Sequence, residues 1–542
     1  MEMHWATVWE SVAGVVPDSA AVTNGAVTRT WAEYERRAAR VAGGLTAAGL
    51  EPGAKVALYL YNGNEYLEAQ FGAFKLRGVP VNVNYRYLDE ELWYLLDNSE
   101  AEALFFHASL ADRVARVAER LPMLTVLIEV DDTGTGDLLG GRAVAYESFV
   151  AGHEPMPPIE RAEDDLYMLY TGGTTGRPKG VMYEIGRHTG FFSQLGFPAI
   201  GLAPPESADA IAPAVAEAAA CGGTSVSVTG APLMHGTGLW LGAMMHHLVG
   251  GHVITLTNRR LDADELLSAI ERHGATHNTI VGDAFSKPII RALDAAAERG
   301  EPYDMSSLRA IVSSGVMWTT EVKGALLDRI PQVVLHDAMG STEGTMGSQI
   351  TMRGAVGETA KFVPNPTTRV FDEFDREVEP GSGQIGRIAS SVLVPLGYYK
   401  DPEKSAQTFR TIDGVRYTFP GDMAQVTADG SLILLGRGSN VINSGGEKIF
   451  PEEVEEAVKR VDGVVDCLVV GVDDERFGQA VTAVASVAPD VSITEDEVIA
   501  AVKNQLAGYK APKRVVFVSQ VPRAPNGKAD YKAAREMATS TR

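Results

Sequence analysis

Cysteine is scarce in this chain of 542 residues. It occurs twice, at Cys221 and Cys467, which lie far apart and form no C-x-x-C pair. A disulfide framework and a cysteine-based zinc site both need paired or closely spaced cysteines, so we expect neither. The low cysteine content fits a protein of the reducing cytoplasm, which is the localisation we expect.

Positive charge is also in deficit. Lysine and arginine number 48 against 70 aspartates and glutamates, which gives a formal net charge of −22. A nucleic-acid-binding protein needs a basic surface to neutralise phosphates, so we do not expect nucleic acid as the main partner. The acidic excess mainly indicates that the protein is soluble.

Targeting and membrane-spanning segments are lacking as well. The acidic start of the chain, residues 1–5, has no basic segment followed by an apolar one, so we expect no signal peptide. The most apolar long window, residues 236–256, contains three histidines and five glycines, which favours a buried helix, turn and strand over a membrane span. Peripheral membrane contact through an apolar substrate entrance stays open, and so does a homodimer.

Hydrophobic patterning predicts an α/β protein with more than one domain, because 542 residues exceed a single core. Helices are expected at 31–49, 66–77, 88–97 and 262–273, and strands at 56–61, 79–83, 103–106, 253–256, 277–281, 309–313 and 333–335. A polar break at 436–440 divides the chain into expected domains 1–436 and 437–542. The Gly/Ala-rich stretch 196–230 has weak periodicity and is expected to be a loop or lid.

The most informative stretch is residues 170–180, Y-T-G-G-T-T-G-R-P-K-G. Its glycines free the backbone, its threonines offer O–H donors and Lys179 adds positive charge, which together suit a nucleotide triphosphate. The stretch lacks the G-x-x-x-x-G-K-[ST] spacing of the common NTPase loop. A separate G-x-G-x-x-G match at 381–386 follows no strand and opens no helix, so we do not read it as a dinucleotide site. The candidate phosphate-binding residues are Thr171, Gly172, Gly173, Thr174, Thr175, Gly176 and Lys179.

Four further motifs follow this loop in order. They are Asp337-Ala338-Met339-Gly340-Ser341-Thr342-Glu343-Gly344, Phe419-Pro420-Gly421-Asp422, Gly436-Arg437, and Val521-Pro522-Arg523-Ala524-Pro525-Asn526-Gly527-Lys528. Each motif alone is also compatible with an ordinary surface turn, since turns collect such residues. Their joint occurrence behind a threonine-glycine loop favours a functional interpretation.

With these motifs the whole chain resembles the adenylate-forming superfamily, which includes acyl-CoA synthetases, luciferases and peptide-synthetase adenylation domains. The resemblance implies a large N-terminal domain of β-sheets, helices and a distorted β-barrel, plus a small mobile α+β C-terminal domain. It also implies ATP, Mg²⁺ and CoA as the molecules that the protein uses, together with a small-molecule carboxylic acid.

The resemblance further implies a role for each motif. Thr171, Thr174, Thr175 and Lys179 would hold the β- and γ-phosphates, and Glu343 would hold Mg²⁺. Thr342 would donate to the α-phosphate, Asp422 and Arg437 would bind the ribose, and Lys528 would bridge the α-phosphate and the substrate carboxylate. The other expected nucleotide-site residues are Ser314, Gly315, Asp337, Ala338, Met339, Gly340 and Ser341.

A second glycine loop, Ser444-Gly445-Gly446-Glu447-Lys448-Ile449, follows the domain break. In the family such a loop reaches the active site after the small domain rotates, and its glycines allow close approach of a pantetheine arm. Lys448 would meet a CoA phosphate or be solvated. Since 14 residues follow Lys528, we expect free CoA rather than a fused carrier domain as the acceptor.

Two positions depart from the family pattern. Ser439 stands where the family's hinge is usually Asp or Lys, and Met339 replaces the aromatic residue that commonly stacks on adenine. A thioether still packs on an aromatic face, so adenine binding is retained as an expectation.

The acyl substrate is indicated by Pro232-Leu233-Met234-His235-Gly236-Thr237-Gly238, which resembles the motif bordering the carboxylate and thiol tunnel. By the same resemblance, segments around 283–287, 313–317 and 338–339 border the acyl group, and their small or apolar side chains favour an apolar acid. The sequences of residues 81–87 and 167–170 resemble those of bacterial fatty-acid or sterol-side-chain CoA ligases. The expected activity is therefore acyl-CoA synthesis through an acyl-AMP. The alternatives are a stand-alone adenylating enzyme that loads a separate carrier protein and a non-catalytic nucleotide-binding scaffold.

Overall fold

The computed structural model describes residues 1–134, 136, 138–171, 177–444, 447–474, 478–489, 491–524 and 527–540. Contacts divide the chain into two compact units, which are described separately below. The first comprises Met1–Thr345, Ile350–Gly357 and Ser391–Thr418, and the second comprises Met346–Gln349, Glu358–Ser390 and Phe419–Arg542. The expected domain boundary between residues 436 and 437 and the hinge at Ser439 stay predictions, because grouping by contacts does not locate the hinge of a mobile domain.

The first unit contains a mainly parallel sheet. Its order is β2-β1-β11-β10-β12-β13-β14, in which β2 pairs antiparallel with β1 and the other pairs are parallel. The strands are β1 (Ala20–Asn24), β2 (Val27–Thr30), β10 (Val226–Thr229), β11 (His252–Thr255), β12 (His277–Ile280), β13 (Ala310–Ser314) and β14 (Val334–Ser341). β15 (Gly344–Thr351) follows β14 after two residues. The alternating helices and strands expected here are confirmed.

A second, wholly parallel sheet of the first unit has the order β4-β3-β5-β6-β7. Its strands are β3 (Lys55–Tyr59), β4 (Val79–Asn82), β5 (Ala101–His107), β6 (Val126–Val130) and β7 (Val144–Ala145). The carboxyl ends of parallel strands meet at one edge of a sheet, so Asn62 after β3 and Asn82 at the end of β4 lie at the same edge. The parallel pairing of β3 and β4 therefore brings these two asparagines to one side of the sheet.

Three antiparallel strands carry the two ends of the threonine-glycine loop. The order is β19-β9-β8, with β8 (Leu166–Thr171), β9 (Lys179–Glu184) and β19 (Gly397–Tyr398). In this sheet β8 is an edge strand. A further hairpin, β20 (Phe409–Ile412) and β21 (Val415–Thr418), closes this unit.

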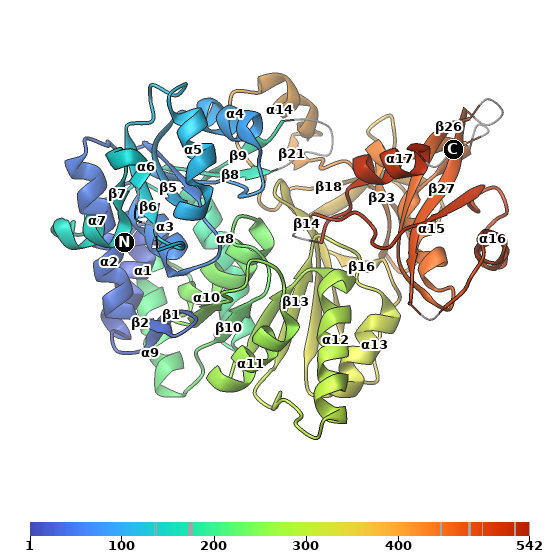
Figure 1. Ribbon diagram of the computed structural model, residues 1–542, viewed down its shortest axis with the longest axis horizontal. Helices are drawn as coiled ribbons and strands as arrows, with labels where there is room; N and C mark the ends of the chain where they lie inside the picture. Colours follow the sequence, from blue (N-terminus) through green and yellow to red (C-terminus); the bar gives the residue numbers. More distant parts are fainter. Residues whose placement is uncertain are drawn as a thin grey trace. The chain divides into compact units, whose positions relative to one another are not determined.

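Helices cover the sheets of the first unit, as the blue-to-green part of the ribbon shows (Figure 1). Thr30 and Glu33 form a reciprocal capping box that starts α2, the signature S/T-x-x-E. The helices are α1 (Trp5–Val15), α2 (Trp31–Ala47), α3 (Asn64–Lys75), α4 (Asp89–Ser99), α5 (Ala111–Ala118), α6 (Leu138–Gly141), α7 (Tyr146–Gly152), α8 (Ile185–Ala199), α9 (Ile211–Ala220), α10 (Met245–Leu248), α11 (Ala263–His273), α12 (Gly282–Glu298), α13 (Thr320–Arg329) and α14 (Pro402–Thr408). Within the described ranges, none of the helices combines the length and apolarity needed to cross a bilayer.

The expectation of a loop or lid at 196–230 is wrong. The segment contains the end of α8, a short helical turn η2 (Ala208–Ala210), all of α9 and strand β10. Alanine has the highest helix propensity but a weak hydrophobic signal, so the helix leaves little periodicity to detect. Ile211, Val215 and Ala218 form its buried stripe.

The second unit joins an antiparallel set of strands to a smaller α+β part. β16 (Lys361–Pro364), β23 (Leu432–Arg437), β22 (Asp422–Val426), β18 (Ile385–Ser390) and β17 (Thr368–Phe371) pair antiparallel in that order. The strand β18 over 385–390 confirms that the G-x-G-x-x-G match opens no helix.

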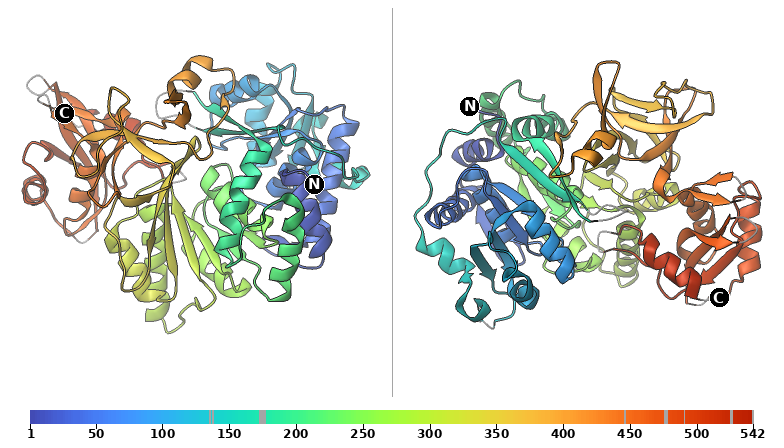
Figure 2. Two further views of the ribbon diagram at one scale, coloured as in Figure 1. Left: turned by 180° about the vertical axis from the view of Figure 1, so that it is seen from behind. Right: turned by 90° about the horizontal axis from the view of Figure 1, so that it is seen from above.

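The smaller part follows the turn η4 (Gly438–Asn440) and forms the red segment in both views of Figure 2. It is built from β24 (Ile442–Ser444), β25 (Glu447–Ile449), α15 (Pro451–Lys459), β26 (Val464–Asp474), β27 (Gly478–Val487), α16 (Glu495–Lys503), β28 (Arg514–Phe517) and α17 (Tyr531–Ser540). Its apolar side chains form cores of their own, such as the one around Val454, Val469 and Val498. The mixed α/β class with a small α+β C-terminal part is confirmed.

A buried cation ties the N-terminal helices together. Lys75, 1% exposed, donates to Glu10 at 2.5 Å and Glu35 at 2.7 Å. Lys75→Met would leave Glu35 without this cation and Glu10 with Arg161 as its remaining partner, and should lower the free energy of unfolding by about 3–5 kcal/mol. Arg116→Met, which removes the exposed Arg116–Asp89 pair, is the control and should cost far less, because water screens an exposed pair. Urea denaturation checks both, and equal losses would contradict the expectation.

Candidate functional site

The two ends of the threonine-glycine loop are held across a hairpin. Thr171 at the end of β8 pairs with Lys179 at the start of β9. Gly172, Gly173, Thr174, Thr175 and Gly176 lie outside the described residues. Both predicted ends of a phosphate loop are therefore brought together by the same antiparallel ladder.

The side chain of Lys179 is already paired. Its Nζ donates to Asp401 Oδ2 at 2.5 Å and lies 5.4 Å from the ring centre of Tyr398. Asp401 also caps α14 by accepting from the Lys404 peptide N–H. The Lys179 ammonium holds the pKa of Asp401 below its ordinary value. The pair is part-exposed, so an anion in solution can compete with Asp401 for the ammonium.

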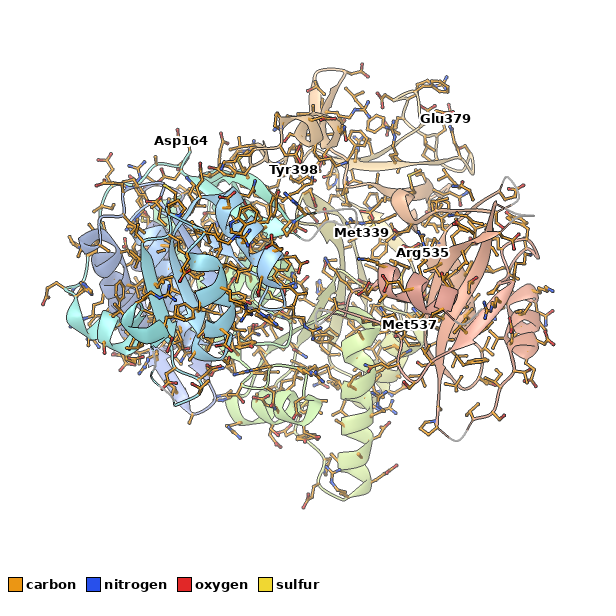
Figure 3. All side chains as sticks on the ribbon, turned by 45° about the horizontal axis from the view of Figure 1, so that its top comes forward. Asp164, Met339, Glu379, Tyr398, Arg535 and Met537 are labelled. Atoms are coloured by element: carbon orange, nitrogen blue, oxygen red, sulfur yellow. The ribbon has the colours of Figure 1, made fainter. Side chains whose placement is uncertain are left out.

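Glu343 lies in the two-residue connection between β14 and β15. The Tyr398 hydroxyl donates to Glu343 Oε1 at 2.8 Å, and the peptide N–H of Glu343 donates to Ser341 Oγ at 3.2 Å. The Tyr183 hydroxyl donates to the Thr342 carbonyl at 2.5 Å. Two tyrosines thus fix this turn from β9 and β19 (Tyr398 is labelled in Figure 3).

The strand before this turn has two different faces. Asp337 and Met339 are buried, whereas Ala338 is half-buried and Gly340 is exposed, as the two-residue period of a strand requires. Ser314 Oγ donates to the Ala338 carbonyl at 2.9 Å across the β13–β14 ladder, and Gly315 follows with a φ of 90°, which suits glycine. Met339, 7% exposed, is labelled in Figure 3.

Asp337 is paired with a buried lysine. Lys323 of α13 donates to its Oδ2 at 2.7 Å. Burial raises the pKa of Asp337 to about 6, although the lysine opposes that shift. The pairing ties β14 to α13, which means that the Asp337 carboxylate already has a structural partner.

His235 begins the turn that leads into η3 (Thr237–Met244), a helical segment with the wide π-helix hydrogen bonding. Its peptide N–H donates to the Pro232 carbonyl at 3.2 Å, and its carbonyl accepts from the Leu239 N–H at 2.9 Å. Gly238 packs directly on this turn, because a Cβ there would lie 2.3 Å from the Pro232 carbonyl oxygen. The loop that carries His235 is therefore tightly packed, and the histidine itself is half-buried.

In the second unit, Asp422 and Arg437 face each other. They are register partners on β22 and β23, with Arg437 Nε 3.4 Å from Asp422 Oδ1. Both side chains are part-exposed. A diol could therefore donate to the Asp422 carboxylate and accept from the Arg437 guanidinium.

A second acidic group, Glu452 of α15, lies behind this pair. A Cβ at Gly436 would lie 2.1 Å from Glu452 Oε2, so only glycine allows this contact. Oε2 is buried and receives no hydrogen bond from the described residues. Burial raises the pKa of Glu452 to about 8, and the nearby Glu455 adds to the shift.

The remaining predicted residues of the second unit lie on two turns. Lys528 is exposed on a tight turn closed by the Ala524 N–H donating to its carbonyl at 2.8 Å. Ser444 pairs with Glu447 in the β24–β25 hairpin, while Gly445, Gly446 and the side chains of Lys448 and Ser439 lie outside the described residues. The residues on either side of the two glycines therefore lie on paired strands.

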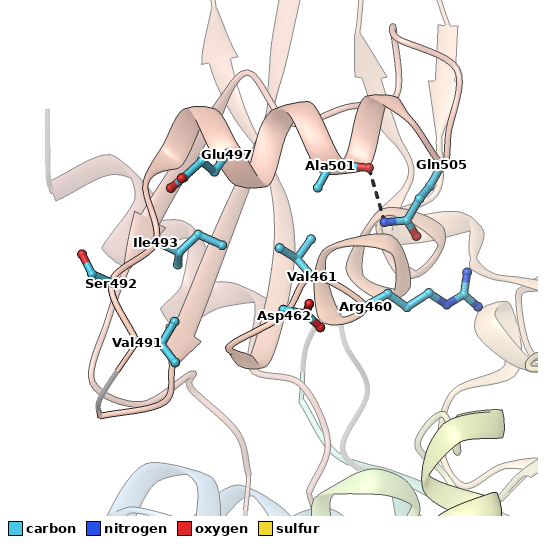
Figure 4. Close-up of a pocket in the computed structure, with 9 residues that line it drawn as sticks. All are labelled: Arg460, Val461, Asp462, Val491, Ser492, Ile493, Glu497, Ala501 and Gln505. Carbon is cyan, nitrogen blue, oxygen red and sulfur yellow. Dashed lines mark hydrogen bonds between the residues drawn. The ribbon is translucent and has the colours of Figure 1, made fainter.

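A cavity of about 460 Å³ in the second unit involves none of the predicted residues. It lies between the end of α15 and α16, where Gln505 donates to the Ala501 carbonyl (Figure 4). Its lining is Arg460, Val461, Asp462, Val491, Ser492, Ile493, Glu497, Ala501 and Gln505. The mixed lining does not identify a ligand.

Among the described residues, no cluster of three or more His, Cys, Asp or Glu side chains could hold a metal by itself. Tyr183, Tyr398, Asp401 and Glu452, which orient the predicted residues, were not found from sequence. Their partners lie far away in the chain, up to 222 residues for Lys179 and Asp401, and no local spacing signals such a contact.

Family comparisons match both parts of the chain. A family described as AMP-binding enzyme matches residues 9–399. A second, described as AMP-binding enzyme C-terminal domain, matches residues 453–528.

Individual relatives align over nearly the whole length. The chain is 38% identical over 542 residues to a protein named 3-oxocholest-4-en-26-oate–CoA ligase from Rhodococcus rhodochrous, covering 99% of this chain and 96% of the relative. It is 40% identical over 551 residues to the medium-chain acyl-CoA ligase Mig of Mycobacterium avium, covering 98% of each. The crystal structure of ATP-bound MatB from Rhodopseudomonas palustris has the same fold, with a TM-score of 0.80 at 24% identity and 99% of each chain covered.

The buried Glu452 makes stability depend on pH. Its pKa is about 8 in the folded protein against an ordinary value of 4.5, so folding favours the protonated form. The resulting stability is complete below about pH 4.5 and is lost as the pH rises toward about 8. Glu452→Gln removes this titration.

Urea denaturation of both proteins between about pH 5 and about pH 9 measures the effect. The wild type should lose stability relative to Glu452→Gln by up to about 1.4 kcal/mol for each pH unit in that window. A difference between the two proteins that does not change with pH would contradict the assignment.

Proposed function

The chain belongs to the AMP-binding enzyme family and is an acyl-CoA ligase, and we propose that its substrate is an apolar carboxylic acid. Enzymes of this kind use ATP and CoA. In the first step the acid attacks the α-phosphate of ATP, which gives acyl-AMP and pyrophosphate. In the second step the thiol of CoA displaces AMP to give acyl-CoA. The observation that supports the proposal best is the full-length relationship at 38–40% identity together with the paired loop ends at Thr171 and Lys179.

The chemistry explains why positive charge and donors are needed. A carboxylate is a poor electrophile, since its leaving group would be oxide, whereas acyl-AMP releases AMP. Forming acyl-AMP brings two anions together and expels a third. Groups that are positive before the reaction begins stabilise this charge best, because they need not reorganise.

We assign the binding of the ATP phosphates to the loop between β8 and β9. Lys179 would exchange Asp401 for the β- and γ-phosphates, and Asp401 would keep the ammonium in place when ATP is absent. Thr171 and the following Gly172, Gly173, Thr174, Thr175 and Gly176 would supply further donors. Thr342 would donate to the α-phosphate from the turn that Tyr183 holds.

Glu343 fits a divalent cation. Tyr398 occupies its Oε1, and Oε2 receives no hydrogen bond from the described part of the chain. Mg²⁺ is commonly held by one or two carboxylates together with substrate phosphates, so a single glutamate next to a phosphate loop is a suitable donor set. When bound, Mg²⁺ would neutralise phosphate charge.

The second unit would complete the nucleotide site and supply the acid-activating lysine. Asp422 would accept from the ribose hydroxyls, and Arg437 would donate to the same sugar. Ser314, Gly315 and residues 337–341 would border the adenine, with Met339 packing on it. Lys528 would bridge the α-phosphate and the carboxylate in the first step.

The second step would use the β24–β25 hairpin. After the C-terminal part, residues 437–542, rotates about Ser439, Gly445 and Gly446 would border the pantetheine arm, with Glu447 beside them. Lys448 would meet a CoA phosphate, and His235 would border the carboxylate and thiol. A cytoplasmic location and a homodimer stay predictions.

Two relatives guide the choice of acid. The first name specifies 3-oxocholest-4-en-26-oate and the second a medium-chain acyl group. Both derive from carboxylic acids with a largely apolar body. The test is pyrophosphate release with ATP and a panel of fatty, aryl and steroid acids, followed by thioester formation with free CoA. AMP formation without a thioester at saturating CoA would favour the carrier-loading alternative, and no pyrophosphate release with any acid would favour the scaffold.

Lys528→Ala should separate the two steps. If the lysine acts only in adenylation, pyrophosphate release should fall by about 100-fold or more, while thioester formation from supplied acyl-AMP should stay within about threefold of the wild type. Lys532→Ala, on an exposed position of α17, is the matched control and should change neither step. Equal loss of both steps in Lys528→Ala would refute the exchange of active-site elements.

Tyr398→Phe should weaken the use of Mg²⁺. The variant keeps the ring beside Lys179 but removes the hydrogen bond to Glu343, so the Mg²⁺ concentration for half-maximal rate should rise by about three- to tenfold. Tyr399→Phe, which removes a 2.6 Å hydrogen bond to Glu100, is the matched control and should leave that concentration unchanged. Identical Mg²⁺ curves for wild type and Tyr398→Phe would disprove the role.

A further inference from the structure

Asn82, the last residue of β4, connects two loops that are distant in sequence. It is 5% exposed and makes three hydrogen bonds. Its Nδ2 donates to the Tyr170 carbonyl at 2.8 Å and to the Met234 carbonyl at 2.7 Å, and its Oδ1 accepts from the Tyr170 N–H at 2.6 Å. Tyr170 immediately precedes Thr171 of the phosphate loop, and Met234 immediately precedes His235.

The chemistry of these partners permits one orientation of the amide. Peptide carbonyls only accept and a peptide N–H only donates, so Nδ2 must face the two carbonyls and Oδ1 the N–H. β8 is the edge strand of its three-stranded sheet, and among the described residues no further strand pairs with its free edge. The Asn82 amide binds both the N–H and the carbonyl of Tyr170, as the backbone of a paired strand would. Tyr170 is the last residue before the phosphate loop.

Asn62 holds the same histidine loop from the neighbouring strand. It follows β3, which pairs in parallel with β4, so both asparagines lie at the carboxyl edge of one sheet. Asn62 Nδ2 donates to the Ala231 carbonyl at 3.3 Å, and its Oδ1 accepts from the Leu233 N–H at 2.8 Å. Asn62 contacts the histidine loop through these bonds, whereas Asn82 contacts both loops.

We propose that Asn82 is a positioning residue that sets the phosphate loop and the His235 loop relative to each other. Where it concerns the acid and CoA, the inference rests on the proposed function. Where it concerns ATP binding, it rests on the three hydrogen bonds and on the assignment of the phosphates to the loop that follows Tyr170. Removing the amide leaves buried backbone groups of Tyr170 and Met234 without partners, and they can recover hydrogen bonds only by moving.

The test compares Asn82→Ala and Asn62→Ala. The dissociation constant for ATP, measured by calorimetry without any acid, should rise by about tenfold in Asn82→Ala and stay within about twofold of wild type in Asn62→Ala. The KM values for the acid and CoA should rise in both variants. Asn82→Ser, which keeps one donor and one acceptor, should give an intermediate ATP affinity and serves if Asn82→Ala does not fold.

Asn64→Ala controls for a merely structural effect. Asn64 is equally buried, 4% exposed, and donates to the Val27 carbonyl at 3.0 Å, outside both loops. It should lower the melting temperature while leaving the ATP dissociation constant and both KM values unchanged. A purely structural Asn82 would behave in the same way, with a smaller active fraction and unaltered binding.

The outcomes separate the two proposals. Wild-type ATP affinity in folded Asn82→Ala and Asn82→Ser would overturn the inference, and so would equal ATP losses in the Asn62 and Asn82 variants. If wild type binds ATP but activates none of the tested acids, the proposed function fails, while the ATP arm still decides the role of Asn82.

Discussion

The structure depends on how the two ends of the threonine-glycine loop are held. A loop of glycines and threonines has no apolar side chains to bury, so its own residues cannot position it. The β8–β9 ladder pairs Thr171 with Lys179, the amide of Asn82 closes the free edge of β8 at Tyr170, and Asp401 engages the Lys179 ammonium. Paired strands and side chains thus fix both ends of the segment that we assign to the phosphates.

Tyrosines hold the acidic turn that follows β14 in a similar way. Tyr398 contacts Glu343 by its hydroxyl and lies beside Lys179 with its ring, so one side chain touches both the carboxylate and the ammonium. Tyr183, from the strand that begins with Lys179, binds the carbonyl of Thr342. The residues that we propose to bind phosphate and Mg²⁺ in the first unit are therefore held by the same two tyrosines. This is consistent with a reaction in which both must act on the same triphosphate.

The second unit presents a different balance of charge. Asp422 and Arg437 are partners on adjacent strands, and Glu452 is pressed against Gly436 behind them. Burial keeps this carboxyl protonated near neutral pH, since its pKa is about 8. When Glu452 is neutral, it does not compete with Asp422 for the Arg437 guanidinium. The arginine is then better able to donate to a ligand.

Much of the fold was predictable because periodicity and turn chemistry are local. The α/β alternation and the small C-terminal part follow from such patterns. The stretch 196–230 was not, since the alanine-rich α9 buries small side chains that leave a weak hydrophobic signal. The contacts of Asn82, Asp401 and Tyr398 were not predictable either, because each joins residues between 55 and 222 positions apart.

The sequence by itself determined which chemical groups are available and in what order: the donors of residues 171–179, then Glu343, Asp422, Arg437 and Lys528. These groups are properties of single residues and short spacings. Only the tertiary structure decided which of them already have partners, such as Asp337 with Lys323 and Lys179 with Asp401, and which polar residues hold the loops in place. The reason is physical: burial and hydrogen bonding depend on neighbours that chain folding supplies, and these neighbours leave no mark in the local sequence.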